Sequence, residues 1–345
     1  MKTTHIELRS DTFTKPGPGM LAAMQRAETG DDVFGEDPTV NRLEAYVAEL
    51  FGMEAALFCP SGTMTNQIAI RCHTRPGDEV ICDSLAHVYI YEGGGMASNS
   101  QAQARPLVAP RGLLDAAQVE AAINPDDIHK APTRLVCLEN TSNRGGGSCY
   151  KQEAMDAIAA VCRRNALALH LDGARIFNAI VARGEDPRYY GKTFDSISVC
   201  LSKGLGAPVG SVLLGQRDWI KQARRIRKVF GGGMRQAGFL AAAGLYALEN
   251  NVERLREDHR HAAMLAETLK GLPWVAAVHA PETNIVLFDL PAGLHTSQVL
   301  TQLAAAGLRA GATGPSQIRF VTHLDVSPEQ IETACALLRG VSFFS

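Results

Sequence analysis

The sequence lacks the features that would point to a membrane span, a disulfide framework, a zinc site or a nucleic-acid partner. It has no apolar run long enough to cross a bilayer, and its first ten residues lack the apolar core of a signal peptide. Its eight cysteines include no C-x-x-C pair and no Cys/His cluster with zinc spacing. A net charge of −2 offers no basic surface to nucleic acid or to an anionic membrane. We therefore expect a cytoplasmic protein with no metal, no nucleic-acid partner and no membrane partner.

The chain also has no internal repeat and no low-complexity linker. It has instead a regular alternation of helix-like and strand-like segments. The short apolar runs that predict strands are residues 55–58, 79–82, 134–138, 167–171, 196–201 and 210–214. Nearly continuous apolar runs separated by helices are typical of parallel strands covered on both faces. We predict an α/β fold whose large domain, residues 1–250, holds a doubly wound and mostly parallel sheet.

A second and smaller domain is expected in residues 251–345. A long helical stretch from residue 236 to about residue 270 leads into it. The segments that follow predict strands at residues 284–288 and 317–321 and helices at residues 297–306 and 327–338. This pattern favours a C-terminal α+β domain.

Two apolar runs end in residues that suit pyridoxal phosphate. Lys203, with Ser202 before it, follows one run, and Asp172 follows an earlier one. In enzymes that use this cofactor, a lysine forms a covalent bond with it and an acid pairs with its pyridine nitrogen. Taken singly, Lys203 could be a surface residue and Asp172 an ordinary turn residue. Their order, about thirty residues apart, makes the pair a strong indication of the cofactor.

Two shorter patterns fit the same cofactor. Ser61, Gly62 and Thr63 open a helix after a strand, where backbone N–H groups and hydroxyls form an anion site suited to a phosphate. The simpler interpretation is a helix cap, and both can hold together. His87 follows the strand at 79–82, where its ring could stack on a cofactor, although a lone histidine at a helix start is more often structural. The basic run 224–228 is most simply a solvated helix face.

With these motifs in place, the chain resembles the low-specificity L-threonine aldolases over almost its whole length. These are pyridoxal-phosphate enzymes of the aspartate-aminotransferase-like fold, also called fold type I. The matching segments are residues 8–12, 30–38, 59–66, 139–141, 171–178, 201–210, 231–238 and 319–325. The resemblance implies a pyridoxal-phosphate-dependent transferase-like fold with a large and a small domain.

The resemblance also implies a role for each residue that aligns with a family motif. The residues expected to bind the cofactor are Ser61, Gly62, Thr63, His87, Asp172, Arg175, Ser202, Lys203, Lys228 and Arg235. Among them, Lys203 would form the covalent bond, Asp172 would pair with the pyridine nitrogen, and His87 would stack over the ring. Lys228 and Arg235 would reach a phosphate in the neighbouring subunit.

A second set of residues is expected to contact the substrate. Ser10, Arg175 and Arg319 would hold the carboxylate, because a guanidinium fork orients such a group with two charge-assisted hydrogen bonds. His129 would lie near the substrate's side chain; without the resemblance it reads as an exposed loop residue. Phe34 stands where similar members often have a tyrosine. Ser142, in the same way, stands where they often have a histidine.

The implied activity is retro-aldol cleavage of L-threonine, L-allo-threonine and related β-hydroxy-α-amino acids to glycine and an aldehyde. The catalytic residues would be Lys203, His87, Asp172 and His129, and the base for the β-hydroxyl is left open between His129, His87 and a water. The resemblance implies a homo-oligomer, a dimer of dimers with shared active sites. The alternatives are another fold-type-I reaction (β-elimination, transamination or racemisation) and a non-catalytic binding protein.

Overall fold

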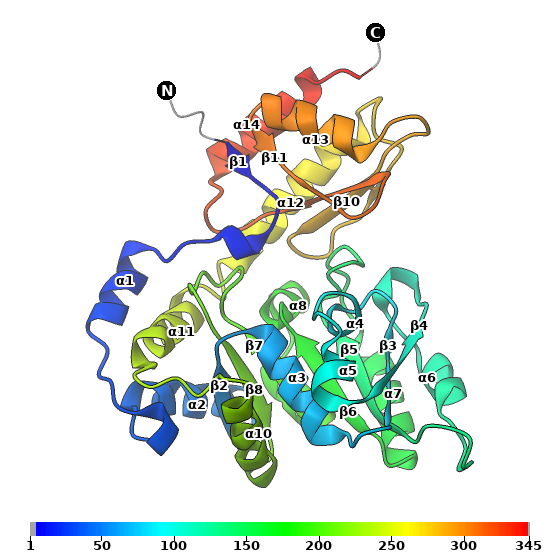
Figure 1. Ribbon diagram of the computed structural model, residues 1–345. Helices are drawn as coiled ribbons and strands as arrows, with labels where there is room; N and C mark the ends of the chain where they lie inside the picture. The colour runs from blue at the N-terminus through cyan, green and yellow to red at the C-terminus, as the bar shows by residue number, and fades with distance from the viewer. Residues whose placement is uncertain (1–4, 344–345) are drawn as a thin grey trace.

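The computed structural model describes residues 5–343, and Figure 1 shows a large body that carries a central sheet and a smaller body above it. Seven strands form the central sheet in the order β2-β8-β7-β6-β5-β3-β4. Their bounds are β2 Ala55–Cys59, β3 Glu79–Asp83, β4 Gln103–Leu107, β5 Thr133–Glu139, β6 Ala168–Gly173, β7 Ser196–Cys200 and β8 Ser211–Gly215. Strand β8 is antiparallel to both of its neighbours, while the other neighbouring pairs from β7 to β4 are parallel.

Helices cover both faces of this sheet. One face packs against α2 Pro38–Phe51, α6 Ala116–Ala122, α7 Gln152–Arg164, α8 Ile176–Arg183, α9 Pro187–Thr193 and α11 Gly238–Asn250. The other face packs against α3 Gly62–His73, α5 Gly95–Ser100 and α10 Arg217–Val229. On β5, Val136 and Leu138 belong to the first core, whereas Leu135 and Cys137 belong to the second. This two-residue alternation between two apolar cores confirms the doubly wound, mostly parallel sheet.

The small body contains a four-stranded antiparallel sheet in the order β12-β13-β10-β9. Its strands are β9 Ala277–His279, β10 Ile285–Asp289, β12 Gly311–Ala312 and β13 Gln317–Val321, and its helices are α12 Leu255–Lys270, α13 Thr296–Ala305 and α14 Pro328–Gly340. The N-terminal strand β1 Ile6–Glu7 pairs with β11 Leu308–Arg309, and Ile6 and Leu8 lie in the small body's core. The chain therefore starts on the small body and then crosses to the large one through α1 Pro18–Gln25. The boundary at residue 250 stays a prediction.

The helical stretch predicted from residue 236 to about 270 is wrong as one continuous helix. Residues 251–254 separate α11 from α12. At this break the Asn251 side-chain amide donates to the carbonyl of Leu205 over 2.7 Å. Side-chain hydrogen bonds of this kind compete with helical backbone bonds and turn the chain.

The solvated-face interpretation of the basic run is also wrong for two of its residues. Arg227 on α10 is 2% exposed, lies 2.7 Å from the Asp32 carboxylate and donates to the carbonyl of Phe58 over 2.6 Å. Arg224 pairs with Glu44 over 2.6 Å. The run was misread because buried acids from other segments supply partners that lie far away in the sequence.

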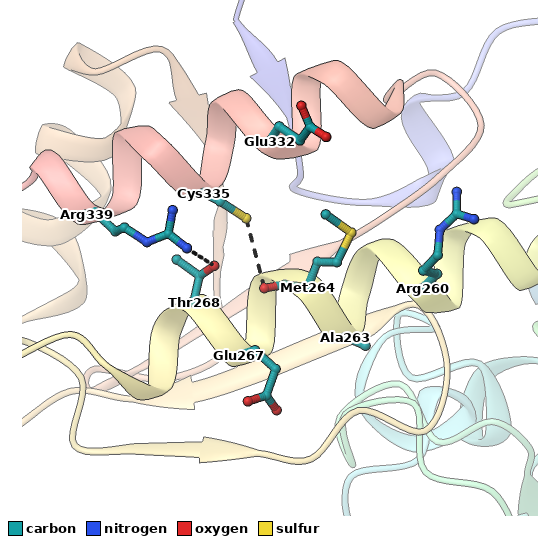
Figure 2. Close-up of a pocket in the computed structure, with 8 residues that line it drawn as sticks. All are labelled: Arg260, Ala263, Met264, Glu267, Thr268, Glu332, Cys335 and Arg339. Atoms are coloured by element: carbon teal, nitrogen blue, oxygen red, sulfur yellow. Dashed lines mark hydrogen bonds between the residues drawn. The ribbon is translucent and has the colours of Figure 1, made fainter.

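Among residues 5–343, no helix combines the length and the apolar character that crossing a membrane requires. The small body carries a groove of about 580 Å³ between α12 and α14, lined among others by Met264, Thr268 and Arg339 (Figure 2). None of the predicted site residues lines this groove.

Candidate active site

The predicted lysine and aspartate lie at the same edge of the central sheet. Asp172 is the next-to-last residue of β6 and lies beside Glu139 of β5 and Ser198 of β7, and Lys203 follows β7 by three residues. Because these strands are parallel, their carboxyl ends meet at one edge, where open α/β sheets bind ligands. Asp172 is 2% exposed and Lys203 is half-buried.

The N-terminus of α3 reaches this edge. The Ser61 side chain caps the helix by accepting the N–H of Met64 over 3.2 Å. A Cβ added at Gly62 would lie 2.5 Å from Cys200 Sγ at the end of β7, so only glycine fits this close approach. Thr65 Oγ1 and Ser198 Oγ lie 2.6 Å apart and hold the helix against the strand. The helix therefore presents its N-terminal amides, with Gly62 and the exposed Thr63, beside the segment that carries Lys203.

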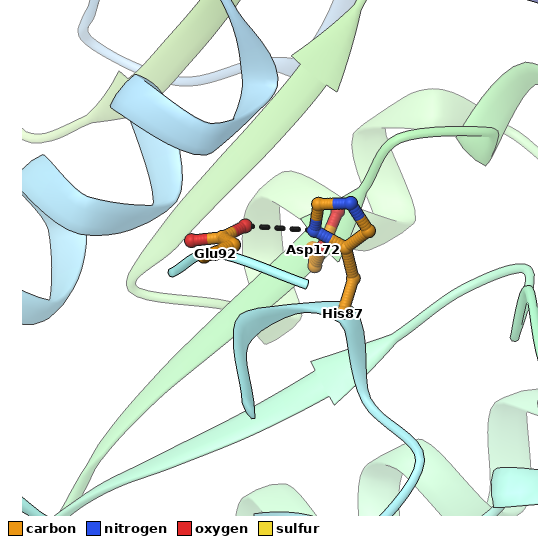
Figure 3. A group of neighbouring side chains, drawn as sticks. All are labelled: His87, Glu92 and Asp172. Atoms are coloured by element: carbon orange, nitrogen blue, oxygen red, sulfur yellow. Dashed lines mark hydrogen bonds and ion pairs between the residues drawn. The ribbon is translucent and has the colours of Figure 1, made fainter. Parts of the chain in front are cut away.

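His87, Glu92 and Asp172 form a compact group, which Figure 3 shows. One nitrogen of His87 and one carboxylate oxygen from each of Glu92 and Asp172 all lie within 4.8 Å of one another. His87 Nδ1 lies 2.9 Å from Glu92 Oε1. Burial disfavours the charged imidazole, but the hydrogen bond with Glu92 and the negative charge of Asp172 outweigh burial and raise the pKa of His87. Glu92 was not among the residues predicted from the sequence, although it lies only five residues after His87.

The same three side chains also offer the donor atoms of a metal site. Amide groups, however, already donate to both carboxylates: Asn66 Nδ2 to Asp172 over 2.9 Å, and Gln67 Nε2 to Glu92 over 2.6 Å. Hydrogen-bond donors on the carboxylates suit a site that holds a protonated nitrogen. The expectation of no metal stays a prediction.

The residues present fit pyridoxal phosphate. A buried carboxylate at Asp172 suits the pyridine nitrogen, and the half-buried Lys203 lies at the same sheet edge. The approach that only Gly62 permits suits a phosphate at the start of α3. His87, with its ring beside Asp172, is placed to contact the cofactor ring.

Arg319 approaches from the small body. It lies on β13, where its Nη1 donates to Asn143 Oδ1 over 2.5 Å and its Nη2 donates to the carbonyl of Arg9 over 3.2 Å. Among the described residues, its buried Nε has no hydrogen-bond partner. Burial and the nearby charge of Arg175 lower the pKa of Arg319 to about 10. A half-buried guanidinium with an unused donor suits an anionic group such as a carboxylate.

Arg175 has a different arrangement. Its Nε and Nη2 donate to the two carboxylate oxygens of Asp11, each over 2.7 Å, and both side chains are buried. Burial alone would raise the pKa of Asp11, but the charge and hydrogen bonds of Arg175 hold it well below the usual range. Asp11 thus occupies two donors of Arg175, and the predicted contacts of Arg175 with cofactor and substrate stay predictions. Ser10, the neighbour of Asp11, caps a short turn through Thr12 N.

Glu139 connects the two sides of the site. Its carboxylate accepts the backbone N–H of His87 and the backbone N–H of Asn143, each over 2.8 Å. Burial and the charge of Asp172 raise the pKa of Glu139 to about 7. Sequence analysis recognised Glu139 only as part of a motif and gave it no role.

The remaining predicted residues lie at the surface. Phe34 is 72% exposed, and Lys228 and Arg235 are exposed nearby, with Arg235 paired to Asp31 over 2.9 Å. His129 lies in the loop before β5, with its side chain 83% exposed and hydrogen-bonded to Asp127 over 2.8 Å. In a single chain, the hydrogen bonds of Arg235 and His129 are made at the surface and not at the site edge.

The sheet order, the two bodies and the lysine–aspartate pair define the class: a fold-type-I, pyridoxal-phosphate-dependent transferase-like fold. Comparison with known proteins is consistent with this class. A family model described as beta-eliminating lyase matches residues 7–292. The low specificity L-threonine aldolase of Escherichia coli (strain K12) is 47% identical over 336 residues, which is 97% of this chain and 98% of that protein. The probable low-specificity L-threonine aldolase 2 of Arabidopsis thaliana is 43% identical over 95% of this chain and 94% of that protein.

Solved structures share the fold. A threonine aldolase from Leishmania major superposes with a TM-score of 0.84 at 22% identity, covering 97% of this chain and 98% of that one. A putative L-allo-threonine aldolase from Listeria monocytogenes gives a TM-score of 0.82 at 22% identity, covering 98% of this chain and 97% of that one. By sequence and by fold, this chain belongs to the low-specificity L-threonine aldolase family.

Proposed function

We propose that this chain is a pyridoxal-phosphate-dependent aldolase that cleaves L-threonine, L-allo-threonine and related β-hydroxy-α-amino acids to glycine and an aldehyde. The observation that supports this most strongly is the position of Lys203 and Asp172 at one edge of the central sheet, in a chain 47% identical to a low specificity L-threonine aldolase. Arg319 of the small body reaches this edge through Asn143, whose backbone N–H donates to Glu139 beside Asp172. The charges of Lys203 and Arg319 both lower the pKa of Asp11, which supports a site that these two cations share.

The cofactor, when bound, supplies an electron-accepting ring that stabilises the negative charge left on the substrate's α-carbon when the bond to the β-carbon breaks. Lys203 would hold the cofactor covalently through its amine. Asp172 would pair with the pyridine nitrogen of the cofactor. Arg319 and Ser10 bind the substrate carboxylate and so orient the α–β bond.

Removing the β-hydroxyl proton requires a base. His87 has its Nδ1 engaged by Glu92 over 2.9 Å, which leaves Nε2 as the ring atom that can accept a proton. His129 and a water are the alternative bases. Because His129 lies at the surface of this chain, it would have to act in a site of another subunit.

We further infer a homo-oligomer, a dimer of dimers in which the active sites are shared between subunits. This proposal is supported by the exposed surface that carries Phe34, Lys228 and Arg235. Val229, which follows Lys228, is itself 82% exposed and adds apolar surface next to the cations. Apolar surface bordered by charge is typical of an interface. In the oligomer, Lys228 and Arg235 would bind the phosphate in the neighbouring subunit's site. A cytoplasmic location stays a prediction.

The test is to incubate the purified, cofactor-loaded protein with L-threonine and with L-allo-threonine. Acetaldehyde and glycine released in equal amounts are the expected result, and the ratio of the two rates measures the stereochemical preference. The matching family model is described as beta-eliminating lyase, so ammonia and a keto acid are measured in the same samples. Ammonia without glycine would replace the aldolase proposal with β-elimination.

A further inference from the structure

A continuous chain of hydrogen bonds lies beneath the site, between α3 and the strands β6 and β7. His73 Nε2 and Ser196 Oγ lie 2.9 Å apart, and Ser196 Oγ lies 2.8 Å from His170 Nδ1. His170 Nε2 lies 3.1 Å from Asn66 Oδ1, and Asn66 Nδ2 lies 2.9 Å from Asp172 Oδ2. The chain therefore connects His73, whose ring stacks on Trp219 with centroids 4.7 Å apart, to the predicted cofactor carboxylate.

The contacts of the Asn66 amide determine which atom donates in each hydrogen bond of this chain. Asn66 Nδ2 lies 2.9 Å from Asp172 Oδ2 and 2.8 Å from Glu92 Oε1. Ionised carboxylates only accept hydrogen bonds, so the two hydrogens of the amide nitrogen must face them and the amide oxygen must face His170. His170 then donates from Nε2 and accepts at Nδ1 from the Ser196 hydroxyl. This assignment rests on the chemistry of the partners and not on the orientation in which the amide is drawn.

Burial keeps the two histidines neutral, which the chain requires. It lowers the pKa of His170 to about 4 and that of His73 to about 3. A neutral His170 has one donor nitrogen and one acceptor nitrogen, and both have a partner of the right kind here. His170 is therefore fixed as the Nε2–H tautomer.

The amide nitrogen of Asn66 donates hydrogen bonds to two carboxylates, those of Asp172 and Glu92. Asp172, Glu92 and Glu139 all lie around the site, and like charges at short range favour protonation of one of them. Two N–H bonds from a neutral amide favour the ionised form of both Asp172 and Glu92. Asp172 needs that form to hold the pyridine nitrogen, and Glu92 needs it to accept His87 Nδ1–H.

We propose that Asn66 and His170 are positioning residues of the cofactor site: His170, through its Nε2–H, fixes the amide of Asn66, and that amide holds Asp172 and Glu92 as ionised acceptors for the pyridine nitrogen and for His87. The proposal rests on the proposed function for the identity of the cofactor but not for the reaction. Sequence analysis gave neither residue a role.

The first test uses the unchanged, cofactor-loaded protein. Neutron crystallography after hydrogen–deuterium exchange locates the hydrogens of buried side chains directly. We expect deuterium or hydrogen on His170 Nε2, none on His170 Nδ1, and two on the Asn66 nitrogen that faces Asp172 and Glu92. A hydrogen on His170 Nδ1 would reverse the chain and overturn the proposal.

The second test measures the dissociation constant of pyridoxal phosphate without substrate. Asn66→Ala removes both donated hydrogen bonds. Because each of these bonds is made to a charged group, we expect the dissociation constant to rise by about tenfold or more. Asn66→Asp keeps the shape of the side chain but adds a carboxylate between Asp172 and Glu92, so we expect it to weaken binding further. His170→Asn should weaken binding in the same direction by a smaller factor.

The control is His261→Asn, which changes a buried histidine on α12 outside this chain of bonds. It should leave the dissociation constant unchanged. A purely structural role for Asn66 predicts the opposite order, with the isosteric Asp variant milder than the Ala variant. That order, or constants within about twofold of the parent for Asn66→Ala and His170→Asn, would overturn the proposal, whether or not the protein releases an aldehyde.

If Asn66→Ala does not fold, the isosteric Asn66→Asp and the neutron measurement still decide the question. Thermal unfolding of each cofactor-free variant separates a loss of fold from a loss of cofactor binding. Because neither readout uses an amino-acid substrate, failure of the aldolase proposal and failure of this one are distinguishable.

Discussion

The predicted site residues fall into two groups, which differ in what the single chain provides for them. Asp172, His87 and Arg319 are buried or half-buried, and each has partners within the chain, namely Asn66, Glu92 and Asn143 among others. A second group, Phe34, His129, Lys228 and Arg235, is exposed at the surface of the chain. We propose that one chain holds the cofactor ring and that a second copy of the chain completes the outer part of the site.

The largest effect is expected at the centre of the buried group. Lys203→Ala removes the amine that bonds the cofactor, and we expect the rate of aldehyde release to fall by at least about a thousandfold. The thermal unfolding of the cofactor-free protein should change little, because Lys203 is only half-buried. The loss of visible absorbance from covalently bound cofactor checks the cause. An unchanged rate in this variant would remove Lys203 from the mechanism.

The next largest effect tests how the two bodies are joined. Asp11→Asn leaves Arg175 as an uncompensated buried charge, and removing one partner of such a pair costs about 3 kcal/mol of unfolding free energy. Urea denaturation at neutral pH measures this cost. Thr12→Ala, which changes an exposed neighbour, is the control and should cost little.

The Asp11 pair also predicts the sign of a pH effect. Folding lowers the pKa of Asp11, so its contribution to stability is complete above the ordinary aspartate pKa of about 4 and is lost as the pH falls below it. Asp11→Asn should therefore lose less stability than the parent between neutral and acidic pH. Equal acid slopes for the two proteins would show that Asp11 is not held ionised by Arg175.

A smaller effect sharpens the contrast with the exposed group. Lys228→Ala should change the unfolding free energy by less than about 0.5 kcal/mol, since the residue is exposed. It should nevertheless weaken cofactor binding by about tenfold if it holds a phosphate in the neighbouring site. Arg225→Ala, on the same helix and also exposed, is the matched control. Equal cofactor affinities for these two variants would leave Lys228 as a surface residue.

The smallest effect is expected at His129. His129→Ala should change the ratio of rates with L-threonine and L-allo-threonine by a few-fold, because the residue is predicted to face the substrate's side chain and not the cofactor. Lys130→Ala, its exposed neighbour, is the control. A ratio that stays constant in the His129 variant would place the stereochemical preference elsewhere.

Much of the fold could be predicted because it depends on local pattern. Apolar runs bounded by turn residues gave the strands, and the carboxyl ends of parallel strands must meet at one edge, which brought Lys203 and Asp172 together. The break between α11 and α12 was missed because it depends on a bond from Asn251 to Leu205, a residue far away in the sequence.

The missing parts of the site depend on contacts between distant segments. Asp11 meets Arg175 only because the N-terminal segment first packs on the small body and then crosses to the large one. His170 meets Asn66 only through the packing of α3 on β6. No local pattern around these residues indicates their partners. Phe34, His129, Lys228 and Arg235 were found only through resemblance to a family, and their proposed roles need a second chain.

The most direct test of the shared site is complementation between two inactive proteins. Lys203→Ala keeps the outer cations, and the double variant Lys228→Glu, Arg235→Glu keeps the lysine. The two proteins are unfolded together, refolded with pyridoxal phosphate and assayed for acetaldehyde release from L-threonine. We expect activity well above the sum of the separately refolded variants, because a mixed dimer would contain one intact site. Activity no greater than that sum would contradict a site shared between subunits.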